Sequence, residues 1–449
     1  DPYATARLEQ LLLDGAVEIQ RAMEPFRADG EPYAEGTDIV FLTQPYRAYV
    51  KTLLEVQHYP GRRGMPNAPA ERPYDVAGWT LPLQMGVKVI TIERRFEPPS
   101  LTRLTAPTIP SGTVWGERKP DYWVIEGRGT GAALALNRLV AAGAQPMWTT
   151  AGIATSAFRY EPGSFVVPYA KSAESAVAGI ARTLGLRVDG LKGRLPQQLQ
   201  PIGRARTALY RPWTASIDEG WTRWILENYG FAPVTLRNDG IQAGNLRERF
   251  DAIILPDASA DSIRNGFGPG IVPGEYTGGI GSQGATALRE FVQAGGTLIA
   301  FNNASLYAIE DLGLPVKNIL AGVKAEEFYC SGSLLRVEIA DESHSAVAGL
   351  PREPVVMFER GPAFETGEGF TGRVLASYPK NQSSLMSGYL LGADRLKGKA
   401  AALEVQVGRG RVYLLGFRPQ WRGQSHGAYK FFMNALFESQ GLSKAASAK

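Results

Sequence analysis

Apolar runs and amphipathic segments alternate through the second half of the chain. Buried strands are predicted at Thr207–Tyr210, Ala252–Leu255, Thr297–Phe301 and residues 411–416, with helices at residues 216–228, 284–294 and 427–437. Strands that alternate with helices are typical of a parallel, doubly wound α/β sheet. In the first helix, Trp221, Trp224 and Ile225 share one face, which predicts that all three pack in the core. Between about residues 325 and 407 only short strands are expected, so residues 206–449 are predicted to form one domain with a β-rich insertion at that place.

The first half of the chain contains a pattern that occurs twice. Each copy has a helix that ends at a glycine, then two strands, then a second helix; the copies begin at Leu8 and Leu136. Self-similarity over this distance predicts a pair of related α/β units, at residues 1–115 and 116–205. Only the second copy has a strand before its first helix, at residues 121–127. We therefore expect that the chain begins inside a larger polypeptide or after a cleavage, or else that the first copy never had this strand.

Composition and charge exclude several classes of protein. The chain has 449 residues and a net charge of +4 without a run of Lys or Arg, so we expect no nucleic-acid partner. No apolar run approaches the roughly 20 residues that span a membrane, and no signal peptide is present. A single cysteine, Cys330, excludes a disulfide within the chain. The three histidines lie too far apart in sequence for a metal-binding motif, and we expect no metal or other cofactor in this chain.

Polar residues follow the ends of the predicted parallel strands. Because ligands bind at the carboxyl ends of such strands, we expect these ends to lie side by side and to form a crevice. The candidates for ligand binding are Arg211, Asp257, Asn302, Asn303, Arg418, Gln420, Arg422 and His426. Their donors would suit an anion or a peptide carboxylate. The alternative is that the loop from Arg418 to His426 is held against the sheet by hydrogen bonds of purely structural purpose.

No catalytic residue can be assigned from the sequence. The turn after Thr297–Phe301, where a nucleophile would be expected, holds two asparagines and lacks the small residues of a nucleophile elbow. Cys330 lies outside the set of strand ends and is interpreted as an inert thiol. A triad of Ser305, His426 and Asp257 can be drawn, but the sequence does not establish its geometry. The glycine-rich turn at residues 127–131 is either a phosphate cradle or an ordinary connection between strand and helix.

Several stretches resemble a known family. Residues 28–30, 36–37, 44–48, 51, 54–55, 59–60 and 73–82, together with the C-terminal stretch 416–427, look like the region after the catalytic domain in large bacterial zinc carboxypeptidase-like proteins. The second half also resembles a class I glutamine amidotransferase-like domain. The resemblance implies a secreted or periplasmic zinc peptidase. However, the family's zinc-binding His-x-x-Glu pair and the nucleophilic cysteine of the amidotransferases are both missing from this chain.

The resemblance implies an accessory, non-catalytic role. The peptidase domain, with its zinc, would lie upstream, and the partners would be that domain or a peptide substrate. Two alternatives remain open: an independent binding module for a small anionic ligand or peptide, and a hydrolase with an unrecognised serine nucleophile. The sequence does not indicate an oligomeric state.

Overall fold

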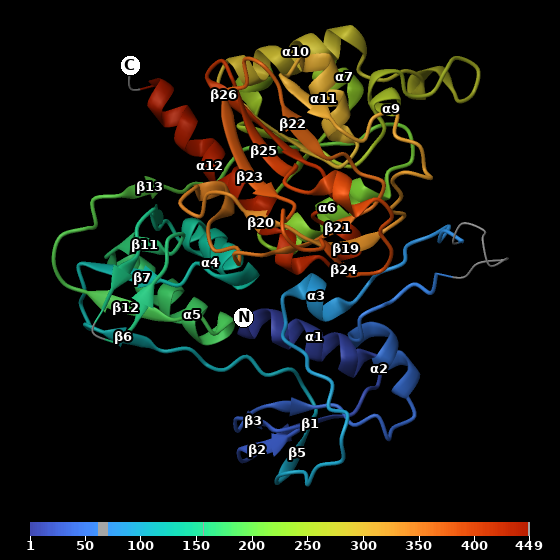
Figure 1. The fold of residues 1–449 in the computed structure, drawn as a ribbon. Coiled ribbons are helices and arrows are strands. Elements are labelled where there is room, and N and C mark those ends of the chain that lie inside the picture. The colour runs from blue at the N-terminus through green and yellow to red at the C-terminus, as the bar shows by residue number, and fades with distance from the viewer. Residues whose placement is uncertain (62–70, 156, 448–449) are drawn as a thin grey trace.

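The computed structural model describes residues 1–61, 71–155 and 157–447, with side chains as far as Ser439. Figure 1 shows three parts that follow one another along the chain: an N-terminal part in blue to cyan, a second part in teal to green, and a larger C-terminal part in yellow-green to red. Within the described residues, no helix is both long enough and apolar enough to span a membrane.

The C-terminal part is built on a ten-stranded sheet whose first five strands are parallel. Their order is β15 (Val234–Leu236), β14 (Thr207–Tyr210), β16 (Ala252–Leu255), β17 (Thr297–Phe301) and β26 (Gly410–Leu415). The helices that follow these strands along the chain are α6 (Ile217–Asn228), α7 (Asn238–Gln242), α8 (Leu246–Arg249), α9 (Ala260–Arg264), α10 (Gly281–Gln293), α11 (Ala304–Leu312) and α12 (Lys430–Ser447). The predicted doubly wound α/β fold is therefore confirmed.

Both faces of this sheet are covered, and the central strands β14, β16 and β17 are buried at every position. Ile254 and Ile299 face a core that includes α6 and the phenylalanines of α12. Ile253 and Leu298 point to the other side, where they pack against α10 and α11. A strand buried on both faces has no polar alternation, which is why its sequence is a continuous apolar run.

The remaining strands of the C-terminal part are antiparallel. β25 (Ala400–Val407) pairs with β26 and extends the sheet to β22 (Phe364–Thr366), β18 (Val316–Asn318), β23 (Gly372–Ser377) and β20 (Glu338–Ile339). A separate three-stranded sheet has the order β21 (Val355–Phe358), β19 (Ser333–Arg336) and β24 (Leu385–Ser387). These strands form the β-rich region that the sequence predicts.

The second part contains a six-stranded sheet of mainly antiparallel pairs. Its order is β13 (Leu199–Pro201), β8 (Met147–Thr149), β11 (Phe165–Pro168), β7 (Tyr122–Ile125), β12 (Val188–Leu191) and β6 (Val114–Gly116). Its two helices are α4 (Gly129–Ala141) and α5 (Glu174–Leu184). β13 lies just before the predicted start of the C-terminal domain at residue 206, and it belongs to the sheet of the second unit.

The first part repeats the same pairings in a smaller sheet. β1 (Ile19–Ala22) lies between β4 (Asp38–Ile39) and β5 (Leu101–Leu104), just as β8 lies between β11 and β13. The helices α1 (Pro2–Asp14) and α2 (Arg47–Leu54) match α4 and α5, and a short helix, α3 (Leu81–Met85), and a hairpin of β2 (Phe26–Ala28) and β3 (Glu31–Tyr33) are added. β4 is an edge strand within the described residues, whereas β7 pairs with β11 at the corresponding place in the second unit.

The predicted packing of α6 is wrong in part. Ile225 is fully buried, but Trp221 and Trp224 are 36% and 43% exposed. The two indoles lie on the outer side of the helix, where they pack against Gly423 in the loop after β26. Apolar spacing predicts a buried face where a helix packs on a sheet. Here only a loop packs against the two tryptophans, so their side chains stay partly exposed.

Candidate functional site

The carboxyl ends of four parallel strands meet at one edge of the sheet, as predicted. β14, β16, β17 and β26 are neighbours and run in the same direction, so the residues after Tyr210, Leu255, Phe301 and Leu415 start from one edge. Asp257, Asn302, Asn303 and Arg418 come together there. Arg211 also follows a strand of this edge, but its side chain is exposed.

Arg418 is the centre of this edge and is bonded to three carboxylates. Its Nε donates to Asp257 Oδ2 at 2.8 Å, its Nη1 to Glu359 Oε2 at 2.5 Å, and its Nη2 to Asp218 Oδ2 at 2.9 Å. The Arg418 side chain is only 15% exposed. Burial lowers the pKa of the guanidinium, but the carboxylates raise it more, so the net shift is upward. Every nitrogen of the guanidinium therefore has an acidic partner already.

The network extends beyond the ion pairs. Gln420, which is fully buried, donates from Nε2 to Asp218 Oδ1 at 2.7 Å, and Trp421 donates from its indole nitrogen to Glu359 Oε2 at 3.0 Å. Burial raises the pKa of Asp218 to about 6, although Arg418 opposes the shift. The network around Arg418 therefore contains three acids for one buried arginine.

Asn302 stands at the turn where a nucleophile would stand. Its φ of 48° lies in the left-handed region, which asparagine tolerates better than most side chains. Its side-chain nitrogen, Nδ2, donates to the backbone carbonyl of Glu359 at 3.2 Å, while its buried Oδ1 has no partner among the described residues. A Cβ on Gly361 would lie 2.2 Å from this oxygen, so the turn is tightly closed. The backbone at Asn302 thus bends as sharply as a nucleophile elbow, which the sequence did not predict. The side chain at this bend is an amide.

Asn303 and Arg422 have different surroundings. The backbone nitrogen of Asn303 donates to Asp257 Oδ1 at 3.0 Å and its side chain donates to the same oxygen at 3.2 Å, so Asn303 and Asp257 join α11 to the end of β16. Arg422 is exposed, and its guanidinium lies 4.8 Å from the centre of the Trp421 ring. Whether any of these residues binds a ligand stays a prediction.

His426 lies apart from the crevice, and the drawn triad is not assembled. The imidazole is 5% exposed, stacks on Tyr429 at 5.0 Å and lines a different cavity. Burial lowers its pKa to about 3, so the ring is neutral. Ser305 Oγ donates to backbone oxygens, at 3.1 Å to Ala300 and at 3.4 Å to Leu415. Asp257 is engaged by Asn303 and Arg418 instead of by a histidine.

Cys330 is predicted to react slowly with alkylating reagents. It is 3% exposed, its Sγ lies 3.6 Å from the carbonyl of Phe358, and burial raises the pKa of its thiol to about 12. Because the thiolate is the reactive form, iodoacetamide should modify the native protein far more slowly than the urea-unfolded protein. Mass spectrometry after timed quenching measures both rates. Rapid modification of the native chain, with loss of a glutaminase activity, would contradict this interpretation.

Two acids of the network, and Trp421, are not among the residues that the sequence predicts for this crevice. Asp218 lies in the first turn of α6, after a Ser216 cap, and Glu359 follows β21 in the β-rich region. Met357 forms an isolated bridge with Arg418, which brings that strand to the edge of the main sheet. Glu359 could have been noted as an acid directly after a buried strand. Its position at this edge could not be predicted, because that strand belongs to a separate sheet.

Comparisons with known proteins find only distant similarity to solved structures. No family model and no curated protein matches the chain. Among solved structures, it is similar to a GMP synthase-type protein from Thermoplasma acidophilum, at 12% identity and a TM-score of 0.35, over 54% of this chain and 97% of that one. It is also similar to a ThuA-like protein from Bacteroides uniformis, at 12% identity and a TM-score of 0.28, over 54% of this chain and 94% of that one. A β-galactosidase from Bacillus circulans matches at 13% identity and a TM-score of 0.31, over 54% of this chain and 31% of that one. Likeness this distant carries no argument about activity, and the α/β assignment rests on the chain's own strand order.

Proposed function

We propose that this chain is a non-catalytic accessory module in which the crevice of an α/β domain has become a structural ion-pair network. The observation that carries the proposal is Arg418, because each of its three guanidinium nitrogens is paired with a carboxylate at the strand ends. Asn302 at the sharp turn supports it, because an amide is not a nucleophile.

The sequence resemblance supplies the setting of this proposal. In that setting the module serves a secreted or periplasmic zinc carboxypeptidase-like protein, where it would support the peptidase domain or its access to peptides. Among the described residues, no group of three or more His, Cys, Asp or Glu side chains is placed to hold a metal ion. The described residues therefore offer no site that fits zinc, and the role proposed for this chain does not use it.

Metal content and turnover test the proposal together. We expect the purified chain, loaded with excess zinc and then desalted, to retain less than about 0.1 zinc per chain by mass spectrometry, because structural and catalytic zinc sites need three or four protein ligands. The same sample should show no hydrolysis of carboxypeptidase, glutaminase or ester substrates. Stoichiometric zinc with peptidase turnover, or a serine ester adduct at Ser305, would overturn the proposal.

A further inference from the structure

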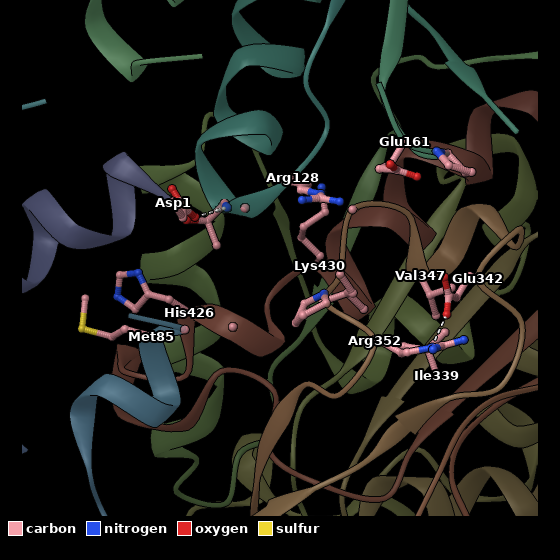
Figure 2. Close-up of a pocket in the computed structure, with 18 residues that line it drawn as sticks. Asp1, Met85, Arg128, Glu161, Ile339, Glu342, Val347, Arg352, His426 and Lys430 are labelled. Carbon is pink, nitrogen blue, oxygen red and sulfur yellow. Dashed lines mark hydrogen bonds and ion pairs between the residues drawn. The ribbon is translucent and has the colours of Figure 1, made fainter. Parts of the chain in front are cut away.

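A cavity of about 490 Å³ lies where the three parts of the chain meet. Its walls include Asp1 from the first part, Arg128 and Glu161 from the second, and Arg352, His426 and Lys430 from the C-terminal part (Figure 2). It differs from the crevice at the strand ends, which contains Arg418. Its volume suits a small polar molecule.

The acids that line this cavity already have partners. The carboxylate of Asp1 accepts from the backbone nitrogens of Tyr3 and Ala4, each at 3.1 Å, and from that of Thr130 at 3.2 Å. Glu342 is bonded to Arg352 at 2.8 Å, and Glu161 lies 3.9 Å from Arg159. Each of these acids therefore has a hydrogen-bonding or ionic partner within the protein.

Two cations on the same walls have no acidic partner among the described residues. Arg128 is exposed and makes no hydrogen bond or ion pair there. Lys430 is 3% exposed, and its Nζ donates only to the carbonyl of Gly127, at 2.6 Å. Two of its three N–H groups remain available. A buried ammonium group without a counter-charge is costly, and burial lowers the pKa of Lys430 to about 7.

A third group on the wall also lacks a partner. Nδ1 of His426 is buried and forms no hydrogen bond. The start of α4, at Gly129 and Thr130, also adjoins the cavity, but the carboxylate of Asp1 already accepts from the backbone nitrogen of Thr130 there. The groups left to be satisfied are thus two cations and one neutral ring nitrogen.

We propose that this cavity binds a small anion through its carboxylate or phosphate group, with Lys430 and Arg128 as the charged contacts at the start of α4. The anion would supply the counter-charge that Lys430 lacks. A hydroxyl on the same ligand could donate to Nδ1 of His426, which favours a hydroxy acid or a phosphate monoester. The site goes beyond the accessory role proposed above, because it uses none of the Arg418 network.

Calorimetric titration of the full chain tests this site with three probes. Tartrate represents hydroxy acids, glycerol 3-phosphate represents phosphate esters, and sulfate keeps its charge between about pH 6 and pH 8.5. We expect at least one of the first two to bind with a Kd below about 1 mM, and Arg128→Ala to weaken that binding by about 10-fold or more. Arg118→Ala, a change of another exposed arginine in the second part, should leave the Kd unchanged.

The pH dependence of sulfate binding tests the contribution of Lys430. Protonation of Lys430 favours the bound anion, so the affinity should fall as the pH rises from about 6 to 8.5, and Lys430→Met should reduce this slope, while the α-amino group of Asp1 on the same wall is present in both proteins. If Lys430→Met does not fold, Arg128→Ala still decides the matter, because Arg128 lies on the surface. No binding of any probe at about 20 mM, or binding that Arg128→Ala leaves unchanged, would overturn the proposal.

Discussion

Arg418→Met should lower the free energy of unfolding by about 3–5 kcal/mol. The substitution keeps most of the side-chain volume but leaves Asp218, Asp257 and Glu359 around a site without a positive charge. Breaking a buried ion pair from one side is costly because the remaining charges stay desolvated. Urea denaturation followed by tryptophan fluorescence measures the change, and a fall in the midpoint without a change in slope would show a loss of stability alone.

Arg422→Met is the matched control for this prediction. Arg422 lies four residues further along the same loop, but it is exposed, forms no ion pair with the three acids, and lies over the face of Trp421. Its loss should cost no more than about 1 kcal/mol, the range of an exposed cation–π contact. Equal effects of the two substitutions would mean that the loop, not the ion pairs, determines the result.

Glu438→Gln should make the protein more stable above about pH 8, by about 2–3 kcal/mol. Tyr413 Oη lies 2.7 Å from Glu404 Oε2 and 2.6 Å from Glu438 Oε2. One hydroxyl hydrogen can serve only one of these oxygens, so the other carboxyl must carry a proton of its own. Burial raises the pKa of Glu438 to about 7 from its usual 4.5, although Arg411 opposes the shift, and glutamine reproduces the neutral form.

The sign of this effect depends on pH. The native pKa of Glu438 is higher than the unfolded one, so proton binding stabilises the native state fully below about pH 4.5, and this contribution is lost as the pH rises through about 7. The advantage of the glutamine variant should therefore be small near pH 5 and reach its full size near pH 8. His344, whose Nε2 lies 3.4 Å from Glu404 Oε2, and Arg411 are present in both proteins. Glu290→Gln, an exposed change on α10, should show no such pH dependence, and a constant difference for Glu438→Gln would refute the shared proton.

The sequence predicts the main sheet well because its strands are apolar on both faces. Ile253 and Ile254 are neighbours and both are fully buried, which only a strand between two helical layers allows. The two related units could be predicted for a different reason, since their helices and strands recur with nearly constant spacing. The packing of Trp221 and Trp224 could not be predicted, because periodicity does not show whether a sheet or only a loop covers that face of the helix.

The composition of the crevice was predicted only in part, for topological reasons. Asp257, Asn303 and Arg418 follow strands of one sheet, so their meeting could be read from strand ends. Glu359 comes from a separate sheet, and only the bridge between Met357 and Arg418 brings it near. His426 leaves the crevice because the turn after Ser425 packs on α3 and α4, and no sequence pattern reports the direction of that loop.

Replacing the whole network at once tests its structural role most directly. The variant would combine Arg418→Met with Asp218→Asn, Asp257→Asn and Glu359→Gln, which removes every charge but keeps the oxygens that accept from Gln420, Asn303 and Trp421. If the crevice is a structural ion-pair network, the fourfold variant should be more stable than Arg418→Met alone. It should recover more than half of the free energy of unfolding that Arg418→Met loses, because no unpaired charge remains buried. If Arg418→Met leaves the free energy of unfolding unchanged and the fourfold variant is no different, the three carboxylates do not depend on Arg418, and the account of this crevice is contradicted.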